Sequence, residues 1–136
     1  MNAPPRVAQL LAAEPAVAKR ELDRLAPEEL LAPSKIVSSD DALLVKAALY
    51  LHHGFLGESH TISQQVATPS GSYWHGIMHR AEGDLDNSRY WYHRVGPHPV
   101  LQQIGGYPQD KPAERREFDL LLEHTIHTAT TGGTTT

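Results

Sequence analysis

The residues best suited to chemistry lie in the segment 73–82, which reads Tyr-Trp-His-Gly-Ile-Met-His-Arg-Ala-Glu. His75, His79 and Glu82 follow one another at intervals of four and three residues, so in a helix their side chains share one face. Two imidazoles at this spacing can reach one divalent cation, and Zn²⁺, Fe²⁺ and Ni²⁺ all accept imidazole together with carboxylate. The segment therefore predicts a divalent-metal site formed by these three residues.

The same segment differs from the helix of a zinc peptidase. In the HExxH pattern, the residue after the first histidine is the glutamate that acts as general base, whereas here that position is Gly76. Peptidase chemistry of that kind is therefore not predicted. Histidines at this spacing also occur in helices that bind no metal, so packing or hydrogen bonding is the alternative for His75 and His79.

A second candidate group is formed by Glu58 and His60. Glu58 falls in an apolar stripe at helical spacing, where a carboxylate is costly to bury unless it is paired or protonated. A carboxylate that orients an imidazole occurs in acid/base catalysis and around metal ions. We therefore expect Glu58 and His60 to act as an acid/base pair. A structural ion pair, or a helix break that leaves Glu58 in water, is the alternative.

Arginines and aromatic residues complete this central region. Arg80 or Arg94 could neutralise an anionic group of a substrate, and Arg80 is the predicted catalytic one. Seven of the nine histidines and seven of the nine aromatic residues lie between positions 50 and 98. The aromatic side chains belong either to the core or to the wall of a small-molecule pocket.

Composition excludes several classes of function. The chain of 136 residues contains no cysteine, which rules out disulfides, thiolate metal sites and cysteine nucleophiles. Its formal net charge of −4 argues against a nucleic-acid partner, because phosphate neutralisation needs clustered Lys and Arg.

No basic stretch followed by an apolar run begins the sequence, and no apolar run could span a bilayer. We expect a cytoplasmic protein without a membrane partner. A homo-oligomer is compatible with the sequence.

The periodicity predicts an all-α fold, because apolar residues recur at helical spacing and no stretch alternates with a period of two. We expect a compact bundle of about five to six helices. One domain would span residues 1–127, with an N-terminal helical arm over 1–35, a site-bearing core over 38–98 and a C-terminal helix over 110–127. The tail 128–136 consists of Thr and Gly apart from one Ala, and we expect it to be disordered.

The helix expected over 41–66 decides how the candidate groups are placed. Ser38 resembles the N-terminal residue of a capping box, but Gly54 and Gly57 each weaken a helix by about 1 kcal/mol relative to Ala. The segment is either one kinked helix or two helices with a break near Gly57. In a continuous helix Glu58 would point toward the core, and His53 and His60 would share one side. Further helices are expected over 72–82 and 87–95.

Three strings in the central region resemble those of a family of small uncharacterised bacterial and fungal proteins. They are Leu-His-His-Gly-Phe-Leu-Gly-Glu-Ser-His (51–60), Tyr-Trp-His-Gly-Ile-Met-His-Arg (73–80) and Asn-Ser-Arg-Tyr-Trp-Tyr-His-Arg-Val-Gly-Pro-His-Pro (87–99). The resemblance covers about the central third to half of the chain. It implies a shared architecture, without an activity.

The leading hypothesis from the sequence is a small helical enzyme with a cavity lined by His and Glu. His75, His79 and Glu82 would hold the metal, while Glu58 and His60 would act on a small polar molecule by hydrolysis or proton abstraction, as in a metal-dependent hydrolase or lyase. Two alternatives stay open. One is a non-enzymatic helical interaction module, and the other is a protein that binds a carbohydrate-like ligand without turnover.

Overall fold

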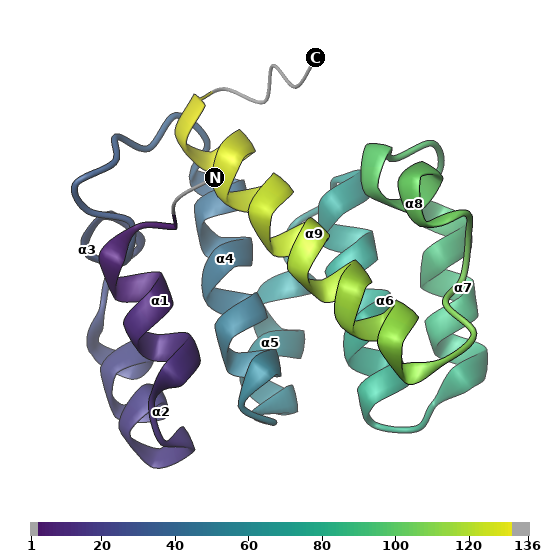
Figure 1. The fold of residues 1–136 in the computed structure, drawn as a ribbon, viewed down its shortest axis with the longest axis horizontal. Helices are drawn as coiled ribbons and strands as arrows, with labels where there is room; N and C mark the ends of the chain where they lie inside the picture. Colours follow the sequence, from purple (N-terminus) through teal and green to yellow (C-terminus); the bar gives the residue numbers. More distant parts are fainter. Residues whose placement is uncertain (1–2, 132–136) are drawn as a thin grey trace.

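The computed structural model describes residues 3–131, and within this range the chain forms helices and no strand (Figure 1). The all-α prediction is confirmed, with more helices than the expected five to six because short segments in the arm and after residue 98 are also helical. The helices are α1 (Pro5–Ala12), α2 (Pro15–Arg24), α3 (Pro27–Leu30), α4 (Ser39–His52), α5 (Leu56–Ser63), α6 (Pro69–Ala81), α7 (Leu85–Val95), α8 (Pro99–Ile104) and α9 (Lys111–Thr131).

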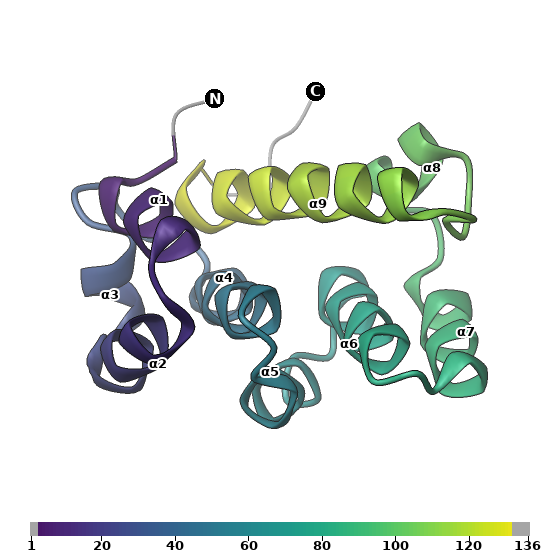
Figure 2. The same cartoon turned by 60° about the horizontal axis from the view of Figure 1, so that its bottom comes forward.

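The long helix α9 crosses one side of the molecule, with α4, α6 and α7 beneath it (Figure 2). α5 lies between α4 and α6 on the side away from α9, and α1–α3 cover the far side of α4. The buried core lies between these layers and includes Leu44, Leu49, Tyr73, Trp74 and Leu121. Within residues 3–131, no helix is both long enough and apolar enough to cross a membrane.

The predicted helix over 41–66 is divided into α4 and α5. The break lies at Gly54, not near Gly57, because Gly54 has a φ of +86° that ends α4. The N–H of Phe55 donates to the carbonyl of Tyr50 at 2.9 Å, and the N–H of Gly54 donates to that of Leu51 at 3.0 Å. This is a Schellman ending with glycine in the left-handed region. His53 and His60 therefore belong to different helices, contrary to the expectation for a continuous one.

Two histidines at the end of α4 hold the N-terminal arm. Nε2 of His52 lies 3.1 Å from the carbonyl oxygen of Leu11, and Nε2 of His53 lies 2.6 Å from that of Leu10. The Nε2 atom of each histidine is therefore hydrogen-bonded to the last turn of α1. These two histidines are structural, and the density of histidine in the central region is partly explained by them.

The C-terminal helix extends beyond the predicted range of 110–127. It begins after Asp110, whose carboxylate accepts the N–H of Ala113 at 2.9 Å, and it continues to Thr131. The carbonyl of Ala129 accepts the N–H groups of Val37 and Ser38, so this end of α9 is held against the start of α4. Residues 128–131 are therefore helical, contrary to the expected tail, and residues 132–136 lie outside the described part of the chain.

Candidate metal centre

Three histidines from two helices meet where α5 packs on α6. His60 of α5 and His75 and His79 of α6 each offer a ring nitrogen, and these nitrogens all lie within 4.8 Å of one another. The ring centroids are 4.7 Å apart for His60 and His75, 5.5 Å for His60 and His79, and 4.8 Å for His75 and His79. We call these residues the histidine trio. His60, predicted as half of an acid/base pair, thus joins the two predicted ligands.

The ends of α6 place its two histidines. Thr68 begins the helix by accepting the N–H of Gly71 at 3.0 Å, one turn before His75. At the other end Gly83 has a φ of +88°, and the N–H of Asp84 donates to the carbonyl of His79 at 2.9 Å. This turn stops the helix just after the second histidine, close to the end of the helix predicted over 72–82. It leaves Glu82 at the helix end, beside the ring of His79.

Glu82 contacts His79 directly. Its Oε1 lies 2.6 Å from Nδ1 of His79, while 41% of the Glu82 side chain is exposed. A carboxylate on one ring nitrogen fixes the orientation of the ring and leaves the other nitrogen for a metal ion. His79, Glu82 and the nearby Asp84 form a second group whose donor atoms lie within 4.8 Å of one another, and in this group Glu82 is exposed while His79 and Asp84 are half-buried.

His75 is the most enclosed member of the histidine trio. It is 4% exposed, and its Nδ1 is buried without a hydrogen-bond partner among the described residues. Trp91 of α7 stacks on its ring at a centroid distance of 3.9 Å. Burial, together with the neighbouring rings of His79 and His60, lowers the pKa of His75 to about 4. The imidazole is therefore neutral at pH 7, which is the form that binds metals.

The dimensions of the histidine trio are close to those of a metal site. With Zn–N bonds of about 2.1 Å, tetrahedral ligands place their nitrogens about 3.4 Å apart. The observed separations reach up to 4.8 Å, so the rings would have to move inward by about 1 Å on binding. His60 and His79 are half-buried, whereas His75 is buried.

Glu58 faces away from this centre. Its carboxylate lies 3.5 Å from Nζ of Lys19 on α2, and 38% of its side chain is exposed. Residues two apart on a helix point about 160° apart, so Glu58 faces α2 while His60 faces α6. The structure does not bring Glu58 and His60 together as an acid/base pair. The expected core-facing position depended on a continuous helix, which the break at Gly54 removes.

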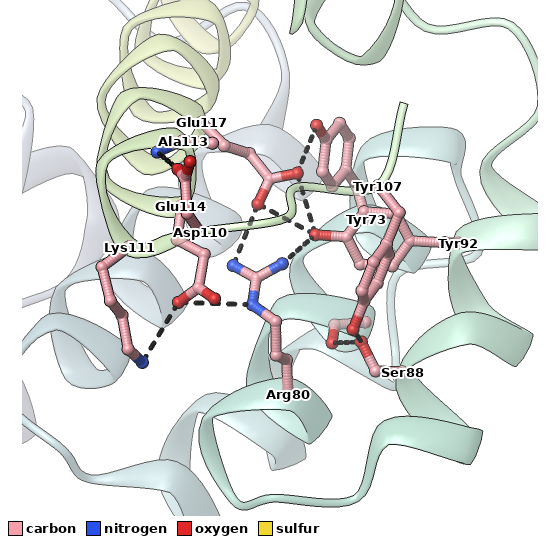
Figure 3. Close-up of polar contacts among 11 residues, drawn as sticks. Tyr73, Arg80, Ser88, Tyr92, Tyr107, Asp110, Lys111, Ala113, Glu114 and Glu117 are labelled. Atoms are coloured by element: carbon pink, nitrogen blue, oxygen red, sulfur yellow. Dashed lines mark hydrogen bonds and ion pairs between the residues drawn. The ribbon is translucent and has the colours of Figure 1, made fainter. Parts of the chain in front are cut away.

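Arg80 belongs to a buried network with Glu117 of α9 (Figure 3). Nη2 of Arg80 donates to Oε1 of Glu117 at 3.0 Å, and Nη1 donates to the hydroxyl of Tyr92 at 2.6 Å. The hydroxyls of Tyr73 and Tyr92 donate to the Glu117 carboxylate, each at 2.9 Å. Nε of Arg80 also lies 3.8 Å from Glu114. The predicted catalytic arginine is therefore engaged in joining α6, α7 and α9.

Burial changes the pKa values of the titratable groups in this network. Glu117 is fully buried, and burial raises its pKa, while Arg80 and the two tyrosine hydroxyls act in the opposite direction. Burial, together with the charge of Glu117, also raises the pKa values of Tyr73 and Tyr92. Both tyrosines therefore keep their hydroxyl protons and donate them, as a paired buried carboxylate requires.

No role was predicted for Glu117 from the sequence. A sequence signal was available, because Glu117 stands four residues before Leu121 and so lies on the apolar face of the last helix.

His98 was likewise given no role. It begins α8, with Nδ1 accepting the N–H of Val100 at 3.1 Å and Nε2 lying 3.0 Å from Oγ of Ser70. Both residues are structural.

Comparison of the chain with family models, with curated proteins and with solved structures finds no match. The resemblance of the three central strings to a family therefore stays a prediction.

Proposed function

We propose that the protein is a metal-dependent enzyme in which the histidine trio holds one divalent cation, of which zinc fits the ligand set best. The observation that carries this proposal is the convergence of His60, His75 and His79 from two helices. The buried Nδ1 of His75 supports it, because this nitrogen has no hydrogen-bond partner among the described residues and is a type of atom that binds metal ions. Three histidines are a donor set of catalytic zinc sites, in which a fourth position stays open for water.

The roles of the predicted residues change accordingly. His60 is a metal ligand instead of a proton carrier, and Glu82 orients His79 from outside the ligand set. A bound divalent metal would lower the pKa of its water to about 7 and so supply a nucleophile at neutral pH. Glu82 replaces Glu58 as the candidate proton acceptor, since it is the exposed carboxylate that contacts His79. These parts suit hydrolysis of a small polar substrate.

Metal analysis of protein purified without a metal-affinity tag tests this proposal. After incubation with zinc and dialysis, the wild type should retain about one equivalent. His60→Ala, His75→Ala and His79→Ala should each retain much less. His93→Ala is the matched control, because His93 is exposed and lies outside the trio. Circular dichroism checks that each variant is folded. Equal zinc content in the control and the trio variants, or no retention by the wild type, would overturn the proposal.

A further inference from the structure

A cavity of about 370 Å³ is lined in part by Trp91, the residue that stacks on His75 of the histidine trio. Its wall includes Ser63 and Gln64 at the end of α5, Thr68 and Ser72 at the start of α6, and Trp91 and Arg94 of α7. The volume falls in the lower part of the usual range for small-molecule sites, about 300–1,000 Å³. The wall combines apolar surface with a few polar groups, which is the usual composition of such sites.

The cavity and the histidine trio share the same helix faces. Ser72, His75 and His79 are spaced by three and four residues and so lie along one side of α6. On α5, Ser63 and Gln64 follow His60 at three and four residues. Trp91 lines the cavity and also stacks on His75 at 3.9 Å. Trp91 is therefore the residue that links the wall of the cavity to the trio.

Arg94 makes the cavity positively charged. The other side chains that line it are neutral, and Arg94 has no ion pair with a carboxylate among the described residues. Its guanidinium lies over the ring of Trp91 at 5.2 Å and makes a long hydrogen bond of 3.4 Å to the hydroxyl of Tyr90. Arg80, by contrast, is bound to Glu114 and Glu117. Arg94 is thus positioned and available for an anion.

We propose that this cavity binds the anionic end of the substrate, a small carboxylate or phosphate ester, and directs its other end to the histidine trio. Arg94 binds the anion through paired N–H groups, a geometry that suits both carboxylate and phosphate. Trp91 supports the apolar body of the ligand, and Gln64 and Ser72 offer hydrogen bonds to its polar groups. The assignment rests on the proposed function for the reacting end, whereas anion binding depends on the cavity alone.

Calorimetric titration of zinc-free protein tests the anion site without a contribution from metal coordination. Benzoate and phenyl phosphate are the probe anions, and benzamide is the neutral control of similar shape. We expect at least one of the two anions to bind. Benzamide should bind at least about tenfold more weakly, because its neutral amide cannot form the charge-assisted hydrogen bond that the anion forms with Arg94. A preference between the two anions identifies carboxylate or phosphate as the natural group.

Variants separate the cavity from other cationic surfaces. Arg94→Gln should weaken binding of the anion about tenfold or more, and Arg94→Lys should weaken it less, because charge remains while the paired geometry is lost. Arg115→Gln is the matched control, since Arg115 is exposed and lines a different groove. Equal anion binding by wild type and Arg94→Gln, or no binding at about 10 mM anion, overturns this inference.

The same samples separate this inference from the metal proposal. Arg94→Gln should keep the zinc content of the wild type, because Arg94 lies outside the trio. If the protein retains zinc but its anion binding does not depend on Arg94, the anion-site proposal is contradicted and the metal proposal is not. Arg94-dependent anion binding in a protein that retains no zinc supports the anion site and contradicts the metal proposal.

Discussion

Nδ1 of His79 and Oε1 of Glu82 lie 2.6 Å apart, at the point where α6 ends. Glu82 follows His79 by three residues, which places the two side chains on one face, and Gly83 with its positive φ ends the helix directly after them. A short carboxylate contact of this kind fixes the imidazole and raises its basicity toward a metal on the other nitrogen. It joins the mostly enclosed ring of His79 to a carboxylate at the surface.

Glu82→Gln should weaken zinc binding by about 10–100-fold without changing the stoichiometry, because the ligands remain while the partner that orients His79 loses its charge. Competition with a chromogenic chelator measures the affinity. Glu123→Gln, an exposed change elsewhere on α9, is the control and should bind zinc like the wild type. An unchanged affinity in Glu82→Gln would show that the contact with His79 has no part in binding.

Glu117→Gln should lower the free energy of unfolding by about 3 kcal/mol or more, because it leaves the buried guanidinium of Arg80 without its closest counter-charge. Urea unfolding at pH 7 measures this. Glu58→Gln is the comparison, since the Glu58–Lys19 pair is far more exposed and should contribute little. Similar losses in both variants would contradict a structural role for the buried network.

Gly76→Ala should destabilise the protein by about 1–3 kcal/mol through overpacking. An added Cβ would lie 2.7 Å from Cδ1 of Tyr92 and 3.2 Å from the carbonyl oxygen of Ser88, so α6 and α7 would have to separate. Gly57→Ala is the matched control inside α5, where nothing lies within 4 Å of the new Cβ. It should raise stability by up to about 1 kcal/mol. Thermal unfolding compares the two, and the opposite order would contradict the close packing of α6 on α7.

His98 should make the protein less stable in mild acid. Burial, together with the nearby His124, lowers the pKa of His98 to about 4 in the folded chain, whereas an unfolded histidine titrates near about 6.5. Between these values the unfolded chain binds a proton that the folded chain does not. The stabilisation is therefore complete above about pH 6.5 and is lost as the pH falls toward 4.

His98→Asn should reduce this pH dependence by about 2 kcal/mol between pH 7 and pH 5. Asn removes the titrating group while keeping a side chain that can accept the N–H of Val100 at the start of α8. Urea unfolding of both proteins at the two pH values gives the comparison. Equal losses in wild type and variant would show that His98 does not control acid stability.

The sequence by itself determined the features that depend on neighbouring residues. The helical periodicity predicted an all-α chain, and the spacing of His75, His79 and Glu82 predicted that these side chains meet on one helix face. The capping of α7 by Asp84 and the positive φ of Gly83 are local features of the same kind, because each acts within one turn of a helix.

Only the tertiary structure decided which distant residues join them. The break at Gly54 turned Glu58 toward α2 and His60 toward α6, and no local pattern distinguishes Gly54 from Gly57 as the residue with positive φ. The pairing of Arg80 with Glu117 spans 37 residues of sequence and arises from the crossing of α6 by α9. Helical periodicity assigns a side chain to a face of its own helix. The partner of that face is set by how helices pack, which depends on burial summed over the whole chain.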